Sequence, residues 1–382
     1  MADEMRRTAL FLLIICCLQI TVNSQDAGKE ERGLSLLFIG DIMGHDTQLW
    51  SAEKEPGKYD YNDVFMYVKP LISAADIAIA NLEVTLAGPP YKGYPQFSSP
   101  AALADACRNA GIEYLVTANN HSVDRGRTGL TGTISRLDSL GIKHTGTFYD
   151  RAARDTLNPL IINKQGYTFA LLNYTYGTNG LKVPFPLIVN MLNKEQITAD
   201  LEKANSLNPD IIVLFLHWGN EYDTVPSASQ AELAAYLLSK GAGLVIGSHP
   251  HVIQKMVWLK GDSVNNDRVT AYSLGNFVSN QRKPKTDGGA MFRVDLVKSG
   301  SGVHVKSAGY YLTWVYTPLI NYEKKFFILP CSEFEKKPDF FPLHTDYLQM
   351  MRFINDSRSL LYSQNLNVYE YILRDGKWIL NK

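Results

Sequence analysis

Two short apolar runs on either side of an amphipathic helical pattern dominate the middle of the chain. Residues 211–216 and residues 244–247 contain no charged or polar side chain. Apolar runs of this length are typical of strands that are buried on both faces of a parallel sheet. The helical pattern between them begins at Ser227 with Gln230 three residues later, as in a capping box. The stretch therefore predicts a βαβ unit, and a chain that contains one is expected to adopt an α/β fold.

Histidines follow both strands at the end where ligands gather in open α/β sheets. His217 follows the first strand, and His249 and His251 follow the second. Residues two positions apart on an extended backbone face the same side, and Pro250 favours an extended conformation at the residue before it. Two imidazoles on one face are suited to a divalent metal, with bonds of roughly 2.0–2.1 Å. The alternative is a turn whose histidines only hydrogen-bond the backbone.

Polar residues also follow three other predicted strands. In chain order, the strands and their polar residues are 34–40 with Asp41 and His45, 77–80 with Asn81 and Glu83, and 114–118 with Asn119, Asn120, His121 and Asp124. A carboxylate directly after a buried strand is unfavourable unless a cation or a metal compensates its charge. Asp41 could instead cap a following helix. Repetition of this pattern at one topological position predicts a shared polar site at the strand ends.

The remaining pattern divides the chain into a main region and a C-terminal segment. Further predicted elements are strands over residues 169–174 and 269–273 and helices over residues 67–75, 101–110, 129–140 and 194–207. After these, residues 291–297 and 303–317 predict strands without intervening helices, which we expect to pack against the first sheet. Residues from about 321 onward are expected to form an appended segment of mixed helix and strand.

The composition is that of an ordinary globular protein. The 382 residues include 38 Lys and Arg against 38 Asp and Glu, so the formal net charge is zero. This balance does not favour binding to nucleic acid or to a charged membrane surface. The length is sufficient for one large domain or two modest ones.

The N-terminus has the pattern of a signal peptide over residues 1–24. Two arginines precede an apolar run over residues 9–20, and the residues up to Ser24 suit cleavage by signal peptidase. The run is shorter than the ~20 residues of a spanning helix. The alternatives are a retained anchor or lipidation at Cys16 or Cys17, although the residue before Cys16 is not a small one. We therefore expect an exported protein, which is periplasmic, extracellular or on the cell surface.

Six motifs follow one another along residues 34–280. They are Gly40-Asp41-Ile42-Met43, Ala80-Asn81-Leu82-Glu83, Ala118-Asn119-Asn120-His121-Ser122-Val123-Asp124-Arg125-Gly126, His217-Trp218-Gly219-Asn220-Glu221-Tyr222, Gly247-Ser248-His249-Pro250-His251-Val252 and Tyr272-Ser273-Leu274-Gly275-Asn276-Phe277. This ordered set resembles the CapA family of poly-γ-glutamate capsule biosynthesis proteins, a branch of the calcineurin-like metallophosphoesterase superfamily. The resemblance implies a four-layer α/β/β/α metallophosphoesterase-like sandwich over residues 33–320 and a short C-terminal extension over residues 321–382. It also implies a two-metal site at the strand ends.

The same resemblance assigns roles to individual residues. The metal ligands that it implies are Asp41, Glu83, Asn120, His217, His249 and His251. His121 corresponds to the acid that protonates the leaving group. The first motif is D-x3-H, ending at His45, where the superfamily has D-x-H, and Asn81-Leu82-Glu83 replaces the usual bridging-aspartate motif. The bridging role of Glu83 is therefore an inference from its position.

The residue types agree with such a site. Mixed carboxylate, amide and imidazole ligands suit Mn, Zn or Fe and do not select among them. Two divalent ions about 3.5–4 Å apart can clamp the oxygens of a phosphoryl or acyl substrate. Asp124, three residues after His121, could orient its imidazole. Arg125 or Arg127 could bind a substrate phosphate or carboxylate, or could be a solvated loop arginine. The predicted substrate contacts are His45, Asn81, Arg125, Glu221 and Asn276.

These patterns and the family resemblance together imply an exported, metal-dependent hydrolase, and the resemblance connects it with capsule, poly-γ-glutamate or other extracellular polymer biosynthesis. Its expected substrate is an anionic polymer or a phosphoester, and its expected partner is membrane-associated capsule machinery. Phosphoester hydrolysis, amide-bond hydrolysis and group transfer all stay open as reactions. The alternative is a non-catalytic, metal-containing factor that binds or exports a polymer. Fold analogy by itself names no substrate.

Overall fold

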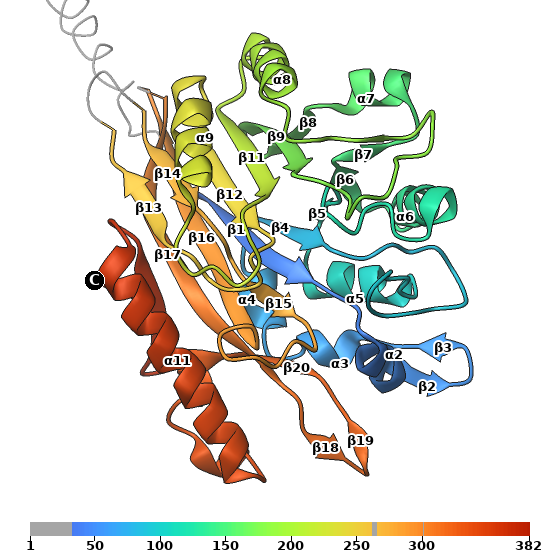
Figure 1. Cartoon of the computed structure of the whole chain (residues 1–382). Helices are drawn as coiled ribbons and strands as arrows, with labels where there is room; N and C mark the ends of the chain where they lie inside the picture. The colour runs from blue at the N-terminus through green and yellow to red at the C-terminus, as the bar shows by residue number, and fades with distance from the viewer. Residues whose placement is uncertain (1–32, 262–265, 301) are drawn as a thin grey trace, which may run out of the picture. The chain divides into compact units, whose positions relative to one another are not determined.

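Two large β-sheets form the framework of the described residues, which are 33–261, 266–300 and 302–382 of this computed structural model (Figure 1). In spatial order, the larger sheet consists of β22 (Lys377–Asn381), β21 (Tyr369–Arg374), β17 (Gly302–Tyr316), β16 (Gly288–Ser299), β1 (Gly33–Ile42), β4 (Ile77–Leu82), β5 (Tyr114–Val116) and β6 (Lys143–Thr145), with β15 (Asn276–Val278) beside β1 and β20 (Phe327–Pro330) beside β17. The smaller sheet consists of β13 (Met256–Leu259), β14 (Arg268–Ala271), β12 (Leu244–Ser248), β11 (Ile211–His217), β9 (Tyr167–Thr175) and β8 (Leu160–Lys164). The predicted signal peptide, residues 1–24, lies outside the described residues.

The βαβ unit predicted from the two apolar runs is confirmed. β11 and β12 pair in parallel, with His217 opposite Ser248. The connecting helix α9 (Ala228–Ser239) starts after Ser227, whose side chain accepts the Gln230 N–H while the Gln230 side chain accepts the Ser227 N–H. Because the two strands end side by side, the residues that follow them start from the same edge of the sheet.

One apolar cluster lies between the two sheets. Phe38 of β1 and Ile79 of β4 share it with Phe215 of β11 and Ile246 of β12. Alternate residues of a strand point to opposite faces, so the neighbours of these residues are directed to the outer faces.

Helices cover both outer faces. Leu37 of β1 packs in one cluster with the buried, free thiol of Cys107 on α5 (Ala102–Ala110). Leu214 of β11 packs with Leu201 of α8 (Lys194–Ser206) and Leu237 of α9. The order helix, sheet, sheet, helix confirms the predicted four-layer α/β/β/α sandwich.

The other predicted helices are present with different bounds. α6 (Gly126–Ser139) starts three residues earlier than expected. α4 (Lys69–Ser73) is shorter than the predicted 67–75 and has its proline in the first turn, where the missing N–H is tolerated. Among the described residues, no helix combines the length and the apolar character needed to cross a membrane.

The strands after residue 287 extend the larger sheet, whereas we expected them to pack against it. β16 pairs with β1, and β17 occupies the next position. The physical reason is that an open β1 edge would leave a row of backbone groups unpaired. β20 and β21 both pair with β17, so the segment after residue 320 adds strands to the same sheet. Helix α11 (His344–Gln364) contributes Met350, Phe353 and Ile354 to the cluster that contains Phe38.

Candidate metal centre

β1 presents Asp41 through a local irregularity at its end. The strand continues to Ile42, beyond the predicted end, and its register with β4 shifts between Ile39 and Asp41. The backbone approaches its neighbour closely at Gly40, where a Cβ would lie 2.2 Å from the Gly275 carbonyl oxygen. Irregularities of this kind re-aim a side chain and are frequent beside active sites. Asp41 is fully buried there.

Glu83 follows β4 and is also fully buried. The Asn81 amide donates to Asp41 Oδ1 at 2.8 Å and to Glu83 Oε2 at 3.3 Å, so one side chain spans both carboxylates. Burial and the neighbouring Asp41 raise the pKa of Glu83 well above its ordinary value. Within the described part of the chain, neither carboxylate forms an ion pair with a lysine or an arginine. Two buried acids in this arrangement are unfavourable unless a cation binds.

His249 and His251 lie in the turn after β12, but not on the extended backbone that we expected. Their φ angles are 99° and 56°, in the region that residues with side chains rarely occupy. β12 ends at Ser248, so the strand pairing that would hold the turn extended stops one residue earlier. Strain of this kind persists where the surrounding structure enforces it, and it is frequent at ligand sites. The two rings nevertheless lie together, with centroids 5.9 Å apart.

His217, the last residue of β11, has contacts at both ring nitrogens. Nδ1 lies 2.9 Å from Ser248 Oγ. Nε2 lies 2.9 Å from Asn120 Oδ1 and 3.5 Å from Glu83 Oε1. Burial lowers the pKa of His217 well below its ordinary value, and burial with neighbouring histidine charge lowers the pKa of His249 to about 3. Both imidazoles are therefore neutral near pH 7, which is the form that binds a metal.

These side chains form two sets of ligand atoms that share one residue. The sets are Asp41 with Glu83 and His217, and Glu83 with His249 and His251. The ligand atoms of each set lie within 4.8 Å of one another, and all of these residues are buried. Glu83 Oε1 and His249 Nδ1 have no hydrogen-bond partner in the described structure, which fits atoms that coordinate a cation. Each set could therefore hold a divalent ion, Glu83 belongs to both sets, and carboxylate with imidazole is compatible with Mn, Zn or Fe.

His121 and Asp124 form a buried pair in the loop after β5. His121 Nδ1 lies 2.8 Å from Asp124 Oδ2, which also accepts the Phe97 N–H at 2.7 Å. The Phe97 ring packs edge-on against His121, with centroids 4.6 Å apart. His121 belongs to neither ligand set, whereas the preceding Asn120 places its Oδ1 beside His217. Because Asp124 engages Nδ1, Nε2 is the nitrogen of His121 that can transfer a proton to a ligand.

Two of the predicted substrate contacts are tied to the loop after β15. His45 belongs to neither ligand set, and its Nδ1 lies 3.2 Å from the backbone nitrogen of Asn280. Asn276 is buried opposite Asp41 in the register of β15 with β1, and its amide donates to the Thr286 carbonyl at 2.8 Å. Both residues connect this loop to the metal centre.

The predicted arginines donate to loop carbonyls. Arg125 donates to the Pro90 carbonyl at 2.8 Å, and Arg127 donates to the Phe185 carbonyl. Glu221 is exposed, and its charge contributes to the raised pKa of the buried Glu83. Glu221 is therefore near the metal centre but outside its buried part.

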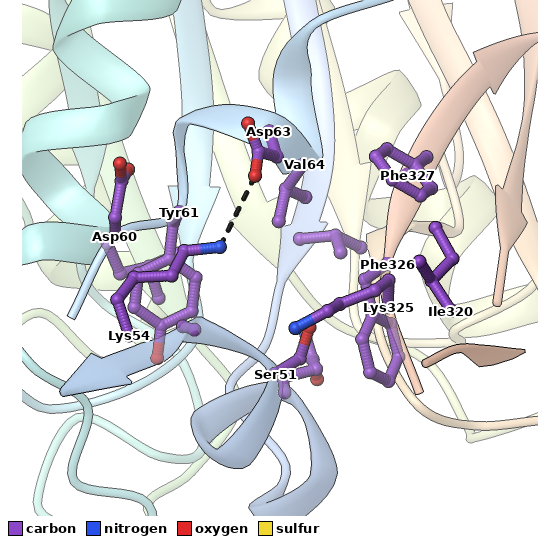
Figure 2. A pocket seen from close by; sticks show the side chains of 14 residues that line it. Ser51, Lys54, Asp60, Tyr61, Asp63, Val64, Ile320, Lys325, Phe326 and Phe327 are labelled. Atoms are coloured by element: carbon purple, nitrogen blue, oxygen red, sulfur yellow. Dashed lines mark hydrogen bonds and ion pairs between the residues drawn. The ribbon is translucent and has the colours of Figure 1, made fainter. Parts of the chain in front are cut away.

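A separate cavity of about 210 Å³ lies between α2 (Asp46–Ala52), α3 (Asn62–Phe65) and the chain leading into β20 (Figure 2). Its apolar side includes Val64, Phe326 and Phe327. At its rim, Lys54 and Asp63 form an ion pair of 3.3 Å. None of the predicted site residues lines this cavity, so it is distinct from the metal centre.

A comparison of the whole sequence with known protein families agrees with the order of the strand-end residues. Residues 35–281 match the family described as bacterial capsule synthesis protein PGA_cap. The chain belongs to this family. All of the residues in the two ligand sets, together with His121 and Asp124, lie inside the matched range.

Relatives of this PGA_cap chain include two Bacillus proteins. The capsule biosynthesis protein CapA of Bacillus anthracis is 29% identical over 290 residues, which cover 72% of this chain and 67% of that protein. The PGA biosynthesis protein CapA of Bacillus subtilis (strain 168) is 28% identical over 277 residues, which cover 70% of this chain and 69% of that protein.

Among solved structures, the chain is similar to two nucleotidases. NAD nucleotidase (NadN) of Haemophilus influenzae aligns with a TM-score of 0.48 and 12% identity over 86% of this chain and 67% of that one. The 5'-nucleotidase of Candida albicans SC5314 aligns with a TM-score of 0.42 and 9% identity over 85% of this chain and 58% of that one.

Sequence reasoning missed two tyrosines at the rim of the metal centre. Tyr176 is 46% exposed, and its ring centroid lies 4.5 Å from that of His249. Tyr222 is 41% exposed, with its ring centroid 6.4 Å from that of His251. Tyr176 directly follows β9, so the rule that polar residues after a strand gather at one edge would have found it. Tyr222 lies inside a motif used for the family resemblance but received no role of its own.

Proposed function

We propose that this protein is a metal-dependent hydrolase of capsule or other extracellular polymer biosynthesis, with a two-metal, phosphoesterase-like site. The observation that carries the proposal is the pair of buried ligand sets that share Glu83, next to the His121–Asp124 pair. Membership of the capsule synthesis family and the names of the two Bacillus relatives support the link to capsule and to poly-γ-glutamate.

The chemistry of the site follows from its donors. Divalent ions bound by the two sets would supply Lewis-acid polarisation of a phosphoryl or acyl oxygen. Asn81 holds Asp41 and Glu83 in one orientation through its amide. His121 donates a proton from Nε2 to the leaving group, while Asp124 accepts the Nδ1 hydrogen and stabilises the protonated ring.

The proposed substrate is an anionic polymer or a phosphoester, and the proposed location is outside the cytoplasm. Support for export comes from the signal-peptide pattern of residues 1–24. An exported protein that acts on a capsule polymer would work beside membrane-associated capsule machinery. The zero formal net charge supports a substrate other than nucleic acid.

The test combines metal analysis of the purified protein with a panel of chromogenic phosphomonoesters, phosphodiesters and γ-glutamyl amides. We expect bound transition metal and turnover of at least one substrate. The His249→Ala/His251→Ala variant should lose most of the metal and the activity while remaining folded, since both residues lie in a turn beyond a strand. Unchanged metal content in this variant would contradict the metal proposal. Full metal content without turnover would favour the alternative, a non-catalytic protein that binds or exports a polymer.

A further inference from the structure

A charged cavity of about 540 Å³ lies where α11 meets the loop after β15 and the end of β17. We call it the C-terminal pocket. The cationic side chains that line it are Arg282, Lys285, Lys324 and Arg352. The carboxylates that line it are Asp287, Asp346 and Asp356. The matched family range ends at residue 281, so every one of these groups lies beyond it.

The charged groups of the C-terminal pocket form no close ion pairs with one another, although Asp287 and Asp346 stabilise the charge of Arg282 from a greater distance. Among the described residues, no ion pair within 4.0 Å joins any two of these seven groups. Arg282 instead donates to the Val315 carbonyl at 2.8 Å and lies over the Trp314 ring, 5.6 Å from its centroid. Charged groups that share a cavity without pairing are available to a ligand with complementary groups.

Two cations of the pocket, Arg282 and Lys324, lie near each other. Burial and the charge of Arg282 lower the pKa of the Lys324 ammonium, whose Nζ donates to Asn280 Oδ1 at 2.7 Å. Lys285 has a φ of 73°, which residues with side chains rarely adopt. Like charges near each other favour an anionic group beside them, and the pocket as a whole has four cations against three carboxylates.

Asp287 requires a different kind of partner. It is 8% exposed, and its Oδ2 accepts the Trp314 Nε1–H at 2.8 Å. Its Oδ1 is buried and has no hydrogen-bond partner in the described structure. An acceptor left in this state is unfavourable, and a ligand N–H would satisfy it. The pocket therefore offers cations to an anionic group and a buried acceptor to an N–H group.

The loop between Asn276 and Asp287 joins this pocket to the metal centre. At one end, Asn276 lies opposite Asp41, and the Asn280 N–H donates to His45 Nδ1. In the middle, Lys283 lies over the ring of Tyr222, 4.9 Å from its centroid, at the rim of the metal centre. The loop then reaches the pocket at Lys285, so Lys283 places one exposed positive charge between the two sites.

We propose that the C-terminal pocket binds a remote segment of an anionic polyamide whose reacting group lies at the metal centre. Carboxylates of such a chain match the lysines and arginines, and its amide N–H groups match Asp287 and the other acceptors. Polyphosphates carry no N–H donors and satisfy only the cations. The proposal rests on the proposed function and assigns a role to α11.

The experiment measures binding by the metal-loaded full chain, using fluorescently labelled glutamate oligomers of graded length and polyphosphate of matched charge. We expect affinity that rises with oligomer length and is higher for the polyamide than for polyphosphate. The Lys285→Gln/Arg352→Gln variant should bind the long oligomer at least about tenfold more weakly, because two charge-assisted contacts are lost. Its metal content and thermal midpoint should stay unchanged. The matched control, Lys69→Gln/Lys143→Gln, removes two exposed cations outside the pocket and should bind as the wild type does.

Three results would overturn the proposal. They are equal affinity of the pocket variant and the wild type, equal affinity for polyphosphate and polyamide, and failure of the wild type to bind either oligomer. Binding can be measured without turnover. If the protein binds the oligomer through the pocket but hydrolyses no substrate, the proposed hydrolase activity is contradicted and the proposed binding role of the pocket is supported.

Discussion

The Nδ1 of His217 lies 2.9 Å from the Oγ of Ser248, and the two residues are opposite each other in the pairing of β11 with β12. If Nδ1–H donates to the hydroxyl, the lone pair of the neutral ring is on Nε2. That nitrogen is the one facing Glu83 and Asn120. We therefore expect Ser248, which belongs to neither ligand set, to favour the tautomer in which Nε2 of His217 can bind a metal.

Ser248→Ala tests this relationship. Loss of the hydroxyl frees the ring to adopt the other tautomer, so metal affinity should fall by about 10–100-fold. Titration of the metal-free protein by calorimetry measures the change, and the exposed Ser206→Ala is the matched control. Wild-type affinity in Ser248→Ala would show that the tautomer is set by another contact.

Comparison of Glu83→Gln with Asp41→Asn tests whether Glu83 is a ligand in both sets. Glu83 belongs to both ligand sets and Asp41 to one. We therefore expect Glu83→Gln to remove both ions and Asp41→Asn to reduce the occupancy of one set, as measured by elemental analysis. Without metal, Glu83→Gln should be more stable at neutral pH by about 1 kcal/mol or more, because it removes a buried carboxylate whose pKa is raised. Equal metal loss in both variants would argue against the bridging position.

His121→Asn distinguishes an acid from a ligand. If His121 protonates the leaving group, kcat should fall by about 10²–10⁴-fold with metal content unchanged. The kcat for substrates with poor leaving groups should fall more than the kcat for substrates with good ones. Asp124→Asn should lower kcat in the same way but less strongly, because Asp124 only orients the His121 ring. A leaving-group series with parallel metal analysis measures these effects. Loss of metal in His121→Asn would instead indicate that His121 is a metal ligand.

The stability of the metal-free protein should depend on pH. Burial lowers the folded-state pKa of His45 to about 4 and that of His249 to about 3, and it lowers that of His217 well below its ordinary value. Below a pH of about 6.5 the unfolded chain binds protons that the folded chain does not, so stability falls by about 1.4 kcal/mol per pH unit for each histidine. The raised pKa of Glu83 makes the stability rise as the pH falls. Glu83 is one group, whereas three histidines act in the other direction.

Urea unfolding at pH 7 and pH 5, in the presence of a chelator, measures this dependence. We expect lower stability at pH 5, and a smaller difference between the two conditions in His45→Gln. Stability that is equal at both pH values in the wild type would contradict the neutral state of these histidines.

Export is a prediction about the N-terminus alone. The pattern of residues 1–24 leads us to expect cleavage between Ser24 and Gln25, and N-terminal sequencing of the mature protein measures it. A mature chain that begins at Met1, or at a lipidated Cys16 or Cys17, would show a different route.

The apolar runs were sufficient to predict the inner strands β1, β4, β5, β9, β11, β12 and β14, the βαβ unit and the polar residues after these strands, but not the edge strands β6, β8 and β13. Hydrophobic period and run length are local properties, and parallel strands bring their carboxyl ends to one edge whatever their exact register. The family resemblance implied six metal ligands at these strand ends: Asp41, Glu83, Asn120, His217, His249 and His251. The structure places five of them within two overlapping ligand sets, and the sixth, Asn120, has its Oδ1 beside His217.

Contacts between distant segments could not be predicted in this way. The Ser248–His217 bond depends on the register of two strands, and the positive φ angles of His249 and His251 depend on packing around a turn. The C-terminal pocket combines a loop near residue 285 with a helix near residue 352, and no local pattern links them. Apolar periodicity reports which face of an element is buried, whereas the partner of each polar atom is decided by packing that joins residues far apart in the chain.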